Sequence, residues 1–213
     1  MFPLHILTLI NGGHTNQTNT LSWSLLHAVR SPNLLDSLRK QSTPDLLEAT
    51  IRETGRLYTN LIMLRRATTP QQIMGHDIPK GAFLAISPLV TARDPTLFEN
   101  PDSFRPERWL TPSQTLDEAA IKTAQRIGSS TQFGKGQHYC LGEKLAKMLI
   151  GMYWEIVLGD AENAGFDVEI VSGCVEGRGV DGVGVEGAWA QENLGTPFEK
   201  GGPLMVRFHE RHS

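Results

Sequence analysis

This sequence of 213 residues contains little cysteine and no long apolar run. Its basic residues do not outnumber its acidic ones. Its two cysteines are too few for a disulfide framework, and no C-x-x-C pair suggests a zinc site. The apolar run over residues 2–10 is interrupted by His5 and Thr8 and falls far short of the ~20 residues that a membrane span needs. Twenty lysines and arginines against 23 aspartates and glutamates give a net charge of −3, which argues against nucleic acid as a partner.

The remaining composition, 39% hydrophobic and 20% charged residues, is that of an ordinary folded protein and excludes a wholly disordered, collagen-like or coiled-coil chain. Hydrophobic spacing predicts a mostly α chain with small β-sheets, an α+β class. A first helix is expected over residues 4–29, although glycines and polar residues in its middle disfavour a helix. Further helices are predicted at residues 46–58, 118–127 and 143–158, with a short one around Leu34, Leu35 and Leu38.

Between and after these helices the pattern changes to strands and loops. Residues 61–90 cluster apolar side chains around turn-forming segments at 75–77 and 79–81, which indicates strands. Residues 93–112 combine proline and aromatic residues without periodicity, which predicts an irregular packed loop. The tail over residues 166–208 is expected to be rich in β-structure, with a glycine-dense stretch at 173–187.

The glycine-rich loop over residues 132–142 runs directly into the predicted helix 143–158. Cys140 lies just before this helix, where unpaired backbone N–H groups and the positive end of the helix dipole stabilise a thiolate. The glycines let the backbone approach a flat, bulky group. A thiolate presented against a planar cofactor is the axial ligation that favours O–O bond cleavage at haem iron. The alternative, a turn holding a buried inert cysteine, is our interpretation of Cys174, which has no such setting.

Residues 133–142, F-G-K-G-Q-H-Y-C-L-G, resemble the haem-binding loop of the cytochrome P450 family, F-x-x-G-x-[RH]-x-C-x-G. The resemblance implies haem b as the cofactor, with Cys140 as the ligand of its iron. It also implies the C-terminal part of the cytochrome P450 fold, incomplete in this chain. The further loop residues that it assigns to cofactor binding are Phe133, Gly134, Gly136, His138 and Gly142.

A second motif, E-x-x-R, lies in the predicted helix 46–58. The spacing of Glu53 and Arg56 puts the carboxylate and the guanidinium on one helix face. Alone, such a pair is usually a solvated surface ion pair worth less than about 1 kcal/mol. Here it resembles the family's E-x-x-R signature, and the later F-R-P-E-R-W segment, residues 104–109, resembles the P-E-R-F segment. The resemblance implies a buried structural network of Glu53, Arg56 and Arg108.

The first predicted helix carries Gly13, His14 and Thr15 in its polar middle. This pattern resembles A-G-x-H-T of the sterol 14α-demethylase branch, in the long distal helix where a kink or bulge makes room for dioxygen. The resemblance implies that His14 and Thr15 relay protons, a role that histidine can take near neutral pH. The alternative is a satisfied polar patch on a buried helix.

Residues 61–70, L-I-M-L-R-R-A-T-T-P, resemble the strand after E-x-x-R in the same branch. By that match Arg65, together with His138, pairs with the haem propionates, which suit a planar bidentate donor. Either arginine of the segment could instead be a surface cation, and we assign that role to Arg66.

The resemblance leads to three hypotheses about function. The first is a haem-thiolate monooxygenase that acts with O2 on an apolar, sterol-like substrate and receives electrons from an NADPH-dependent reductase. The second is a truncated, non-catalytic remnant with weak or no haem binding, because the resemblance covers less than half of the family's fold. The third is a reductase-independent haem-thiolate isomerase of peroxides. For a full-length parent the family implies an endoplasmic reticulum membrane location through an N-terminal anchor, which we expect to be missing here.

Overall fold

The computed structural model describes most of the helical part of the chain and pieces of the tail. The described residues are 2–40, 45–58, 62–127, 133–134, 136–159, 165–172, 189–192, 196–199, 202–203 and 205–211. Their side chains are described from residue 12 onward, except at residues 127, 138, 170–172, 189–192, 196–199, 202–203 and 205. Cys174 and the glycine-dense stretch at 173–187 lie outside them, as does the side chain of His138.

Helices make up the body of the molecule. They are α1 (Phe2–Arg30), α2 (Pro32–Arg39), α3 (Leu46–Tyr58), α4 (Pro88–Ala92), α5 (Glu118–Ile127) and α6 (Glu143–Leu158), with 3-10 turns η1 (Pro106–Trp109) and η2 (Gly136–His138). The ranges of α3, α5 and α6 coincide with those expected from hydrophobic spacing. Among the described residues, no helix is long and apolar enough to cross a membrane.

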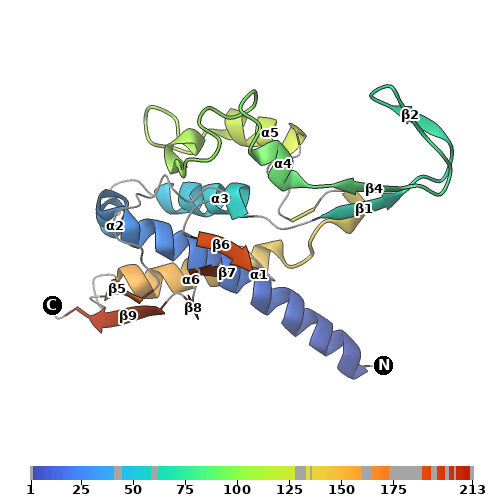
Figure 1. Ribbon diagram of the computed structural model, residues 1–213. Helices are drawn as coiled ribbons and strands as arrows, with labels where there is room; N and C mark the ends of the chain where they lie inside the picture. Colours follow the sequence, from blue (N-terminus) through green and yellow to red (C-terminus); the bar gives the residue numbers. More distant parts are fainter. Residues whose placement is uncertain are drawn as a thin grey trace.

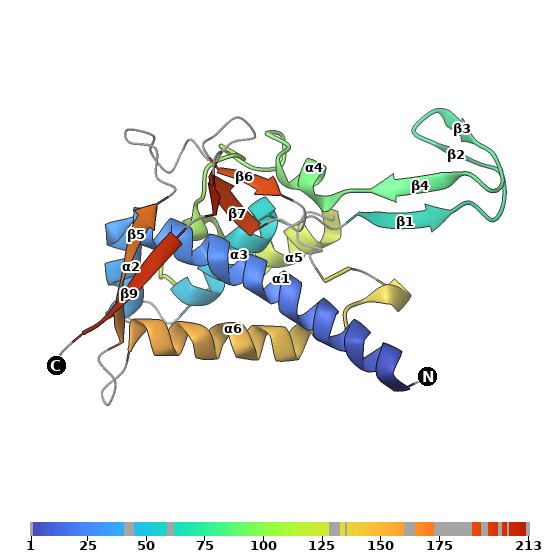
Figure 2. The same cartoon turned by 60° about the horizontal axis from the view of Figure 1, so that its bottom comes forward.

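The helices stack in layers (Figure 1): α3 lies between the α4–α5 region and α1, and α6 runs beside α1 on the other side. In Figure 2 the N-terminal half of α1 extends away from the other elements. The larger core joins α1, α2, α3, α5, η1 and α6, and its largest members are Trp109, 2% exposed, and Trp154, fully buried. The indole Nε1 of Trp154 donates to Oγ of Ser24, 3.3 Å away, which links α6 to α1.

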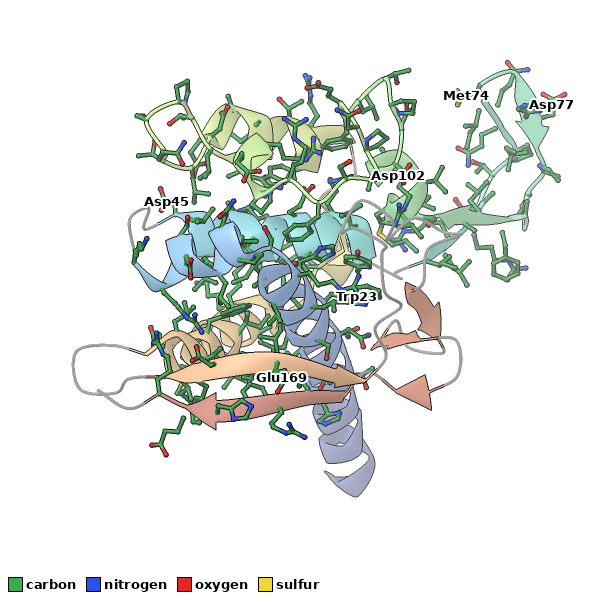
Figure 3. All side chains as sticks on the ribbon, turned by 60° about the vertical axis from the view of Figure 1, so that its left-hand side comes forward. Trp23, Asp45, Met74, Asp77, Asp102 and Glu169 are labelled. Atoms are coloured by element: carbon green, nitrogen blue, oxygen red, sulfur yellow. The ribbon has the colours of Figure 1, made fainter. Side chains whose placement is uncertain are left out.

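Four small antiparallel sheets complete the described fold, and with the helices they confirm the predicted α+β class. Their strands are β1 (Met63–Arg66) with β4 (Phe83–Ile86), β2 (Gln71–Ile73) with β3 (His76–Ile78), β5 (Phe166–Ser172) with β9 (Met205–Glu210), and β6 (Trp189–Glu192), β7 (Thr196–Glu199) and β8 (Gly202–Pro203) in one sheet. Figure 3 shows Met74 and Asp77 at the tip of the β2–β3 hairpin, far from Trp23 in the interior.

Two expectations from the sequence were wrong. Residues 88–90, the end of the expected strand region 61–90, belong to α4 and not to a strand, because Pro88 occupies the first helical position, where its fixed φ and missing N–H suit a helix. Helix α1 continues through Gly12 and Gly13 as an α-helix, so of the kink or bulge that the resemblance implied, a bulge is not formed there. Its threonines satisfy their hydroxyl groups on carbonyls one turn earlier: Thr18 Oγ1 donates to the carbonyl of His14 and Thr20 Oγ1 to that of Asn16, at 2.8 and 3.0 Å.

The turn between α6 and β5 contains a glycine that no other residue can replace without strain. Gly165 has φ +73°, and a Cβ there would lie 2.6 Å from the backbone of both Leu158 and Gly159. We expect Gly165→Ala to lower the free energy of unfolding by about 2–3 kcal/mol in urea titrations, because the backbone cannot move aside as a side chain would. Gly151→Ala is the matched control: a Cβ meets nothing within 4 Å there, and stability should rise by up to about 1 kcal/mol. If the two substitutions changed the free energy of unfolding equally, the close backbone contact at Gly165 would be contradicted.

Candidate functional site

A buried ion pair on one face of α3 is the first part of the site. Glu53 and Arg56, three residues apart, are both 0% exposed. The guanidinium donates through Nη2 to Oε1 of Glu53 at 2.8 Å and through Nε to Oε2 at 2.9 Å. This bidentate geometry is the strongest form of an arginine–carboxylate contact. The pair is therefore part of the interior and not a solvated surface pair.

The segment around η1 supplies the remaining hydrogen-bond donors to the carboxylate of Glu53. Nε of Arg108 donates to Oε1 of Glu53 at 3.0 Å, so the structure brings the three predicted network residues together. The backbone N–H of Arg105 donates to the same oxygen at 2.9 Å, and the indole Nε1 of Trp109 donates to Oε2 at 2.9 Å. Burial lowers the pKa of Arg108 from its ordinary value, and the carboxylate of Glu53 acts in the opposite direction. Five donor contacts satisfy one buried carboxylate.

Arg56 also holds the irregular loop before η1. Its Nη1 donates to the carbonyl of Ala92 at 2.6 Å and of Pro101 at 2.7 Å, and its Nη2 donates to that of Ser103 at 3.2 Å. The guanidinium also lies 5.1 Å from the ring centroid of Phe98. Sequence reasoning missed these carbonyls, since nothing in a sequence marks a backbone acceptor. It also missed Trp109, although a tryptophan beside Arg108 was a usable signal, because a buried indole N–H requires a partner.

The cysteine loop lies between α5 and α6. Gly134 and Gly136 have φ of +76° and +70°, a left-handed conformation that favours glycine. The backbone N–H of Cys140 donates to the carbonyl of Phe133 at 2.8 Å, which closes the loop, and Gly142 is the N-cap residue of α6. Cys140 forms no disulfide among the described residues and is exposed, and it lies three residues before the first residue of α6.

Charged side chains tie the cysteine loop to α3. Glu143 accepts a hydrogen bond from the hydroxyl of Tyr139, the neighbour of Cys140, and this bond raises the pKa of Tyr139 to about 12. Lys147 Nζ lies 2.8 Å from Glu143 and 3.9 Å from Glu48 of α3. These contacts were not predicted, although the i, i+4 spacing of Glu143 and Lys147 would have indicated an ion pair.

The two proposed proton-relay residues lie on α1, apart from the cysteine loop in the sequence. His14 is exposed and Thr15 is half-buried, so the consecutive side chains lie on different faces of the helix. The two arginines of β1 are both exposed. Nη1 of Arg65 donates to the carbonyl of its neighbour Leu64 at 2.8 Å, whereas the guanidinium of Arg66 lies 5.8 Å from the ring centroid of Phe83.

The cysteine loop fits the edge and face of a flat cofactor. The space around the α-hydrogens of Gly136 is open, since a Cβ there would meet nothing within 4 Å. Leu141 is fully exposed and provides an apolar side chain next to the thiol. The first turn of α6 has no side-chain cap, which leaves backbone N–H groups facing the cysteine loop. A haem held by a Cys140 thiolate is compatible with each of these features.

Comparison with known proteins agrees with this geometry. Residues 4–160 match the family model described as Cytochrome P450. The cytochrome P450 monooxygenase pyvB of Aspergillus violaceofuscus is 33% identical over 69% of this chain and 31% of the relative. The lanosterol 14-alpha demethylase of Cunninghamella elegans is 31% identical over 65% of this chain and 33% of the relative. The mitochondrial sterol 26-hydroxylase of Rattus norvegicus is 32% identical over 66% of this chain and 29% of the relative. The chain spans about a third of the length of these relatives, and it belongs to the cytochrome P450 family.

Proposed function

We propose that this chain contributes the cysteine side of a haem-dependent monooxygenase. The observation that carries the proposal is the exposed Cys140 at the start of α6, on a loop with two left-handed glycines. The buried Glu53–Arg56–Arg108 network supports it, because that network makes the region around α3 and η1 rigid. The names of the relatives, which include monooxygenases and sterol hydroxylases, support the same reaction class.

In this proposal Cys140 holds the iron of haem b through its thiolate. The bound haem supplies the activation of dioxygen. The loop backbone stays close to the cofactor at Gly134, Gly136 and Gly142, since a Cβ at these positions would hold the backbone away from the cofactor. Phe133 lies at the start of the loop, with Lys147 Nζ 5.9 Å from its ring centroid.

The remaining residues take positioning and proton-transfer roles. Arg65 and His138 bind the carboxylate groups of the cofactor edge. The guanidinium of Arg65 is exposed on β1, and a carboxylate would replace the local bond that it makes to the carbonyl of Leu64. His14 and Thr15 move protons toward the site of oxygen reduction, and an imidazole near neutral pH can both take up and release a proton. Electrons come from an NADPH-dependent reductase.

The proposed substrate is an apolar, sterol-like molecule. Two of the relatives are named for sterol or lanosterol chemistry, and those names are the support for this class. The proposed location of the complete enzyme is the endoplasmic reticulum membrane, in keeping with an apolar substrate.

An exposed apolar face on α6 favours the second hypothesis, in which this chain alone does not catalyse. Leu145, Met148, Leu149, Met152 and Ile156 recur at helical spacing and are each 38–54% exposed. Such a stripe indicates a surface that packs against another element in the active enzyme. The proposed activity therefore belongs to a protein in which this face is covered.

The test is the spectrum of the reduced, carbon monoxide-treated protein after haem addition. We expect the red-shifted Soret band of thiolate-ligated haem, and we expect Cys140→Ala to abolish it completely. Cys174→Ala is the matched control and should leave the band unchanged, because Cys174 has no comparable setting. A band that survives Cys140→Ala would overturn the ligand assignment. No band in the unsubstituted chain would favour the non-catalytic remnant, and turnover without NADPH and reductase would favour the isomerase.

A further inference from the structure

Four aromatic rings that form two stacked pairs lie where α1 meets the end of α3. We call these residues, Trp23, His27, Tyr58 and Phe104, the aromatic cluster. The rings of Trp23 and Tyr58 stack with centroids 3.7 Å apart and an interplanar angle of 8°. The rings of His27 and Phe104 stack at 3.8 Å and 7°. Trp23 is 0% exposed and His27 is 1% exposed. None of the roles given above uses these residues.

One hydrogen bond joins the two stacked pairs. Nε2 of His27 lies 2.7 Å from the hydroxyl of Tyr58, and the bond is buried. Nδ1 of His27 is buried and has no hydrogen-bond partner among the described residues. Burial lowers the pKa of His27 to about 3, and the charge of Arg30 adds to this effect, so the imidazole is neutral near pH 7. Burial also raises the pKa of Tyr58 well above its ordinary range. A neutral imidazole therefore lies in contact with a phenol that keeps its proton.

This arrangement matters when the phenol loses an electron. An oxidised phenol is a far stronger acid than the phenol itself, so it releases its proton as it is oxidised. If no acceptor took this proton, the oxidised phenol would keep a positive charge in an apolar interior, and an unpaired buried charge is very costly. In the tautomer that carries its proton on Nδ1, Nε2 of His27, at 2.7 Å, is placed to accept the phenol proton, and the face of Phe104 is placed to stabilise the resulting imidazolium.

We propose that Tyr58 is a redox-active tyrosine, with His27 as its proton acceptor and Trp23 as its electron acceptor. When a one-electron oxidant removes an electron from Trp23, the stacked Tyr58 passes an electron to the Trp23 radical cation. In the same step the phenol proton moves to Nε2 of His27. The products are neutral Trp23, a neutral Tyr58 radical and a protonated His27, so charge and atoms balance. The inference rests on the proposed function for its use in the cell, since haem-thiolate oxygen chemistry is a source of one-electron oxidants.

The chain allows a clean test because it contains only three tyrosines, Tyr58, Tyr139 and Tyr153. The double variant Y139F/Y153F leaves Tyr58 as the sole source of a tyrosyl radical. The haem-free chain is alkylated at its thiols and oxidised by flash photolysis of a ruthenium tris-bipyridyl complex with an electron-accepting quencher. Trapped radicals are then measured by electron paramagnetic resonance (EPR). Because no haem is involved, the result does not depend on the outcome of the carbon monoxide experiment.

We expect a tyrosyl signal that couples to one exchangeable proton, and we expect the coupling to disappear after exchange into heavy water. Adding Y58F to the double variant should remove the tyrosyl signal. Adding H27F, which keeps an aromatic ring against Phe104, should lower the radical yield at least tenfold. Adding W23F should slow radical formation by a similar factor.

Three results would overturn the proposal: a Tyr58 radical without an exchangeable proton coupling, an unchanged yield in H27F, or an unchanged formation rate in W23F. The coupling to the exchangeable proton is read in a protein that retains the whole aromatic cluster, so this arm remains decisive if H27F or W23F does not fold.

Discussion

Glu53→Gln is expected to lower the free energy of unfolding by roughly 3–5 kcal/mol, the cost of removing one partner from a buried ion pair. The amide keeps the shape of the carboxylate but removes its charge. Arg56 would then remain at 0% exposure without a counter-charge, and Arg108, with its Nε 3.0 Å from Glu53, would lose its closest anion. The indole N–H of Trp109 and the backbone N–H of Arg105 would compete for one remaining carbonyl oxygen. Urea titrations followed by circular dichroism measure the change.

Glu48→Gln on the same helix is the matched control. Glu48 also forms a close ion pair, with Nη2 of Arg52 at 2.7 Å, but both side chains are partly exposed. Water screens this pair, so the loss should stay below about 1 kcal/mol. If the two substitutions cost the same, the network around Glu53 is not the buried, fully paired arrangement described above.

The helices that carry the site could be predicted closely from the sequence, because each has a strong local signal. In α3 the apolar positions recur at helical spacing and Asp45 precedes the first turn, where its carbonyl accepts the N–H of Ala49. In α6 the cysteine loop supplies Gly142 immediately before the helix. Local propensity was less informative for α1, where the glycines at 12 and 13 and the polar residues after them disfavoured a helix. Hydrogen bonds from Thr18 and Thr20 to the preceding turn accompany an uninterrupted helix.

Contacts between distant segments could not be predicted in the same way. The spacing of Glu53 and Arg56 is visible as a motif, but the carbonyls that Arg56 binds come from the end of α4 and the loop after it, 36 to 47 residues later. Backbone acceptors have no residue type, so only the folded path of the loop reveals them. The stack of Trp23 on Tyr58 joins α1 to α3 and similarly has no local signal. The sequence therefore predicts which residues are candidates, and tertiary packing decides which groups they contact.

The pH dependence of stability should report the other buried polar contact, that of His27. In the folded chain burial lowers the pKa of His27 from its ordinary value of 6.5 to about 3. Between these two pH values the unfolded chain binds a proton at this position that the folded chain does not, so stability falls as the pH is lowered through this window. About 3 kcal/mol should be lost between pH 7.5 and 4.5, and the loss would reach its limit of about 5 kcal/mol only below the folded pKa of about 3.

His27→Leu separates this effect from all other titrations. The leucine removes the hydrogen bond to the hydroxyl of Tyr58, which shifts stability by a constant amount at every pH. It also removes the only group whose protonation differs between the two proteins. Urea titrations at pH 7.5, 6, 5.5 and 4.5 should therefore give a steeper fall in stability for the unsubstituted chain, by about 3 kcal/mol over the range. Parallel curves would mean that His27 is able to take up a proton in the folded state, and that the interior between α1 and α3 tolerates the charge.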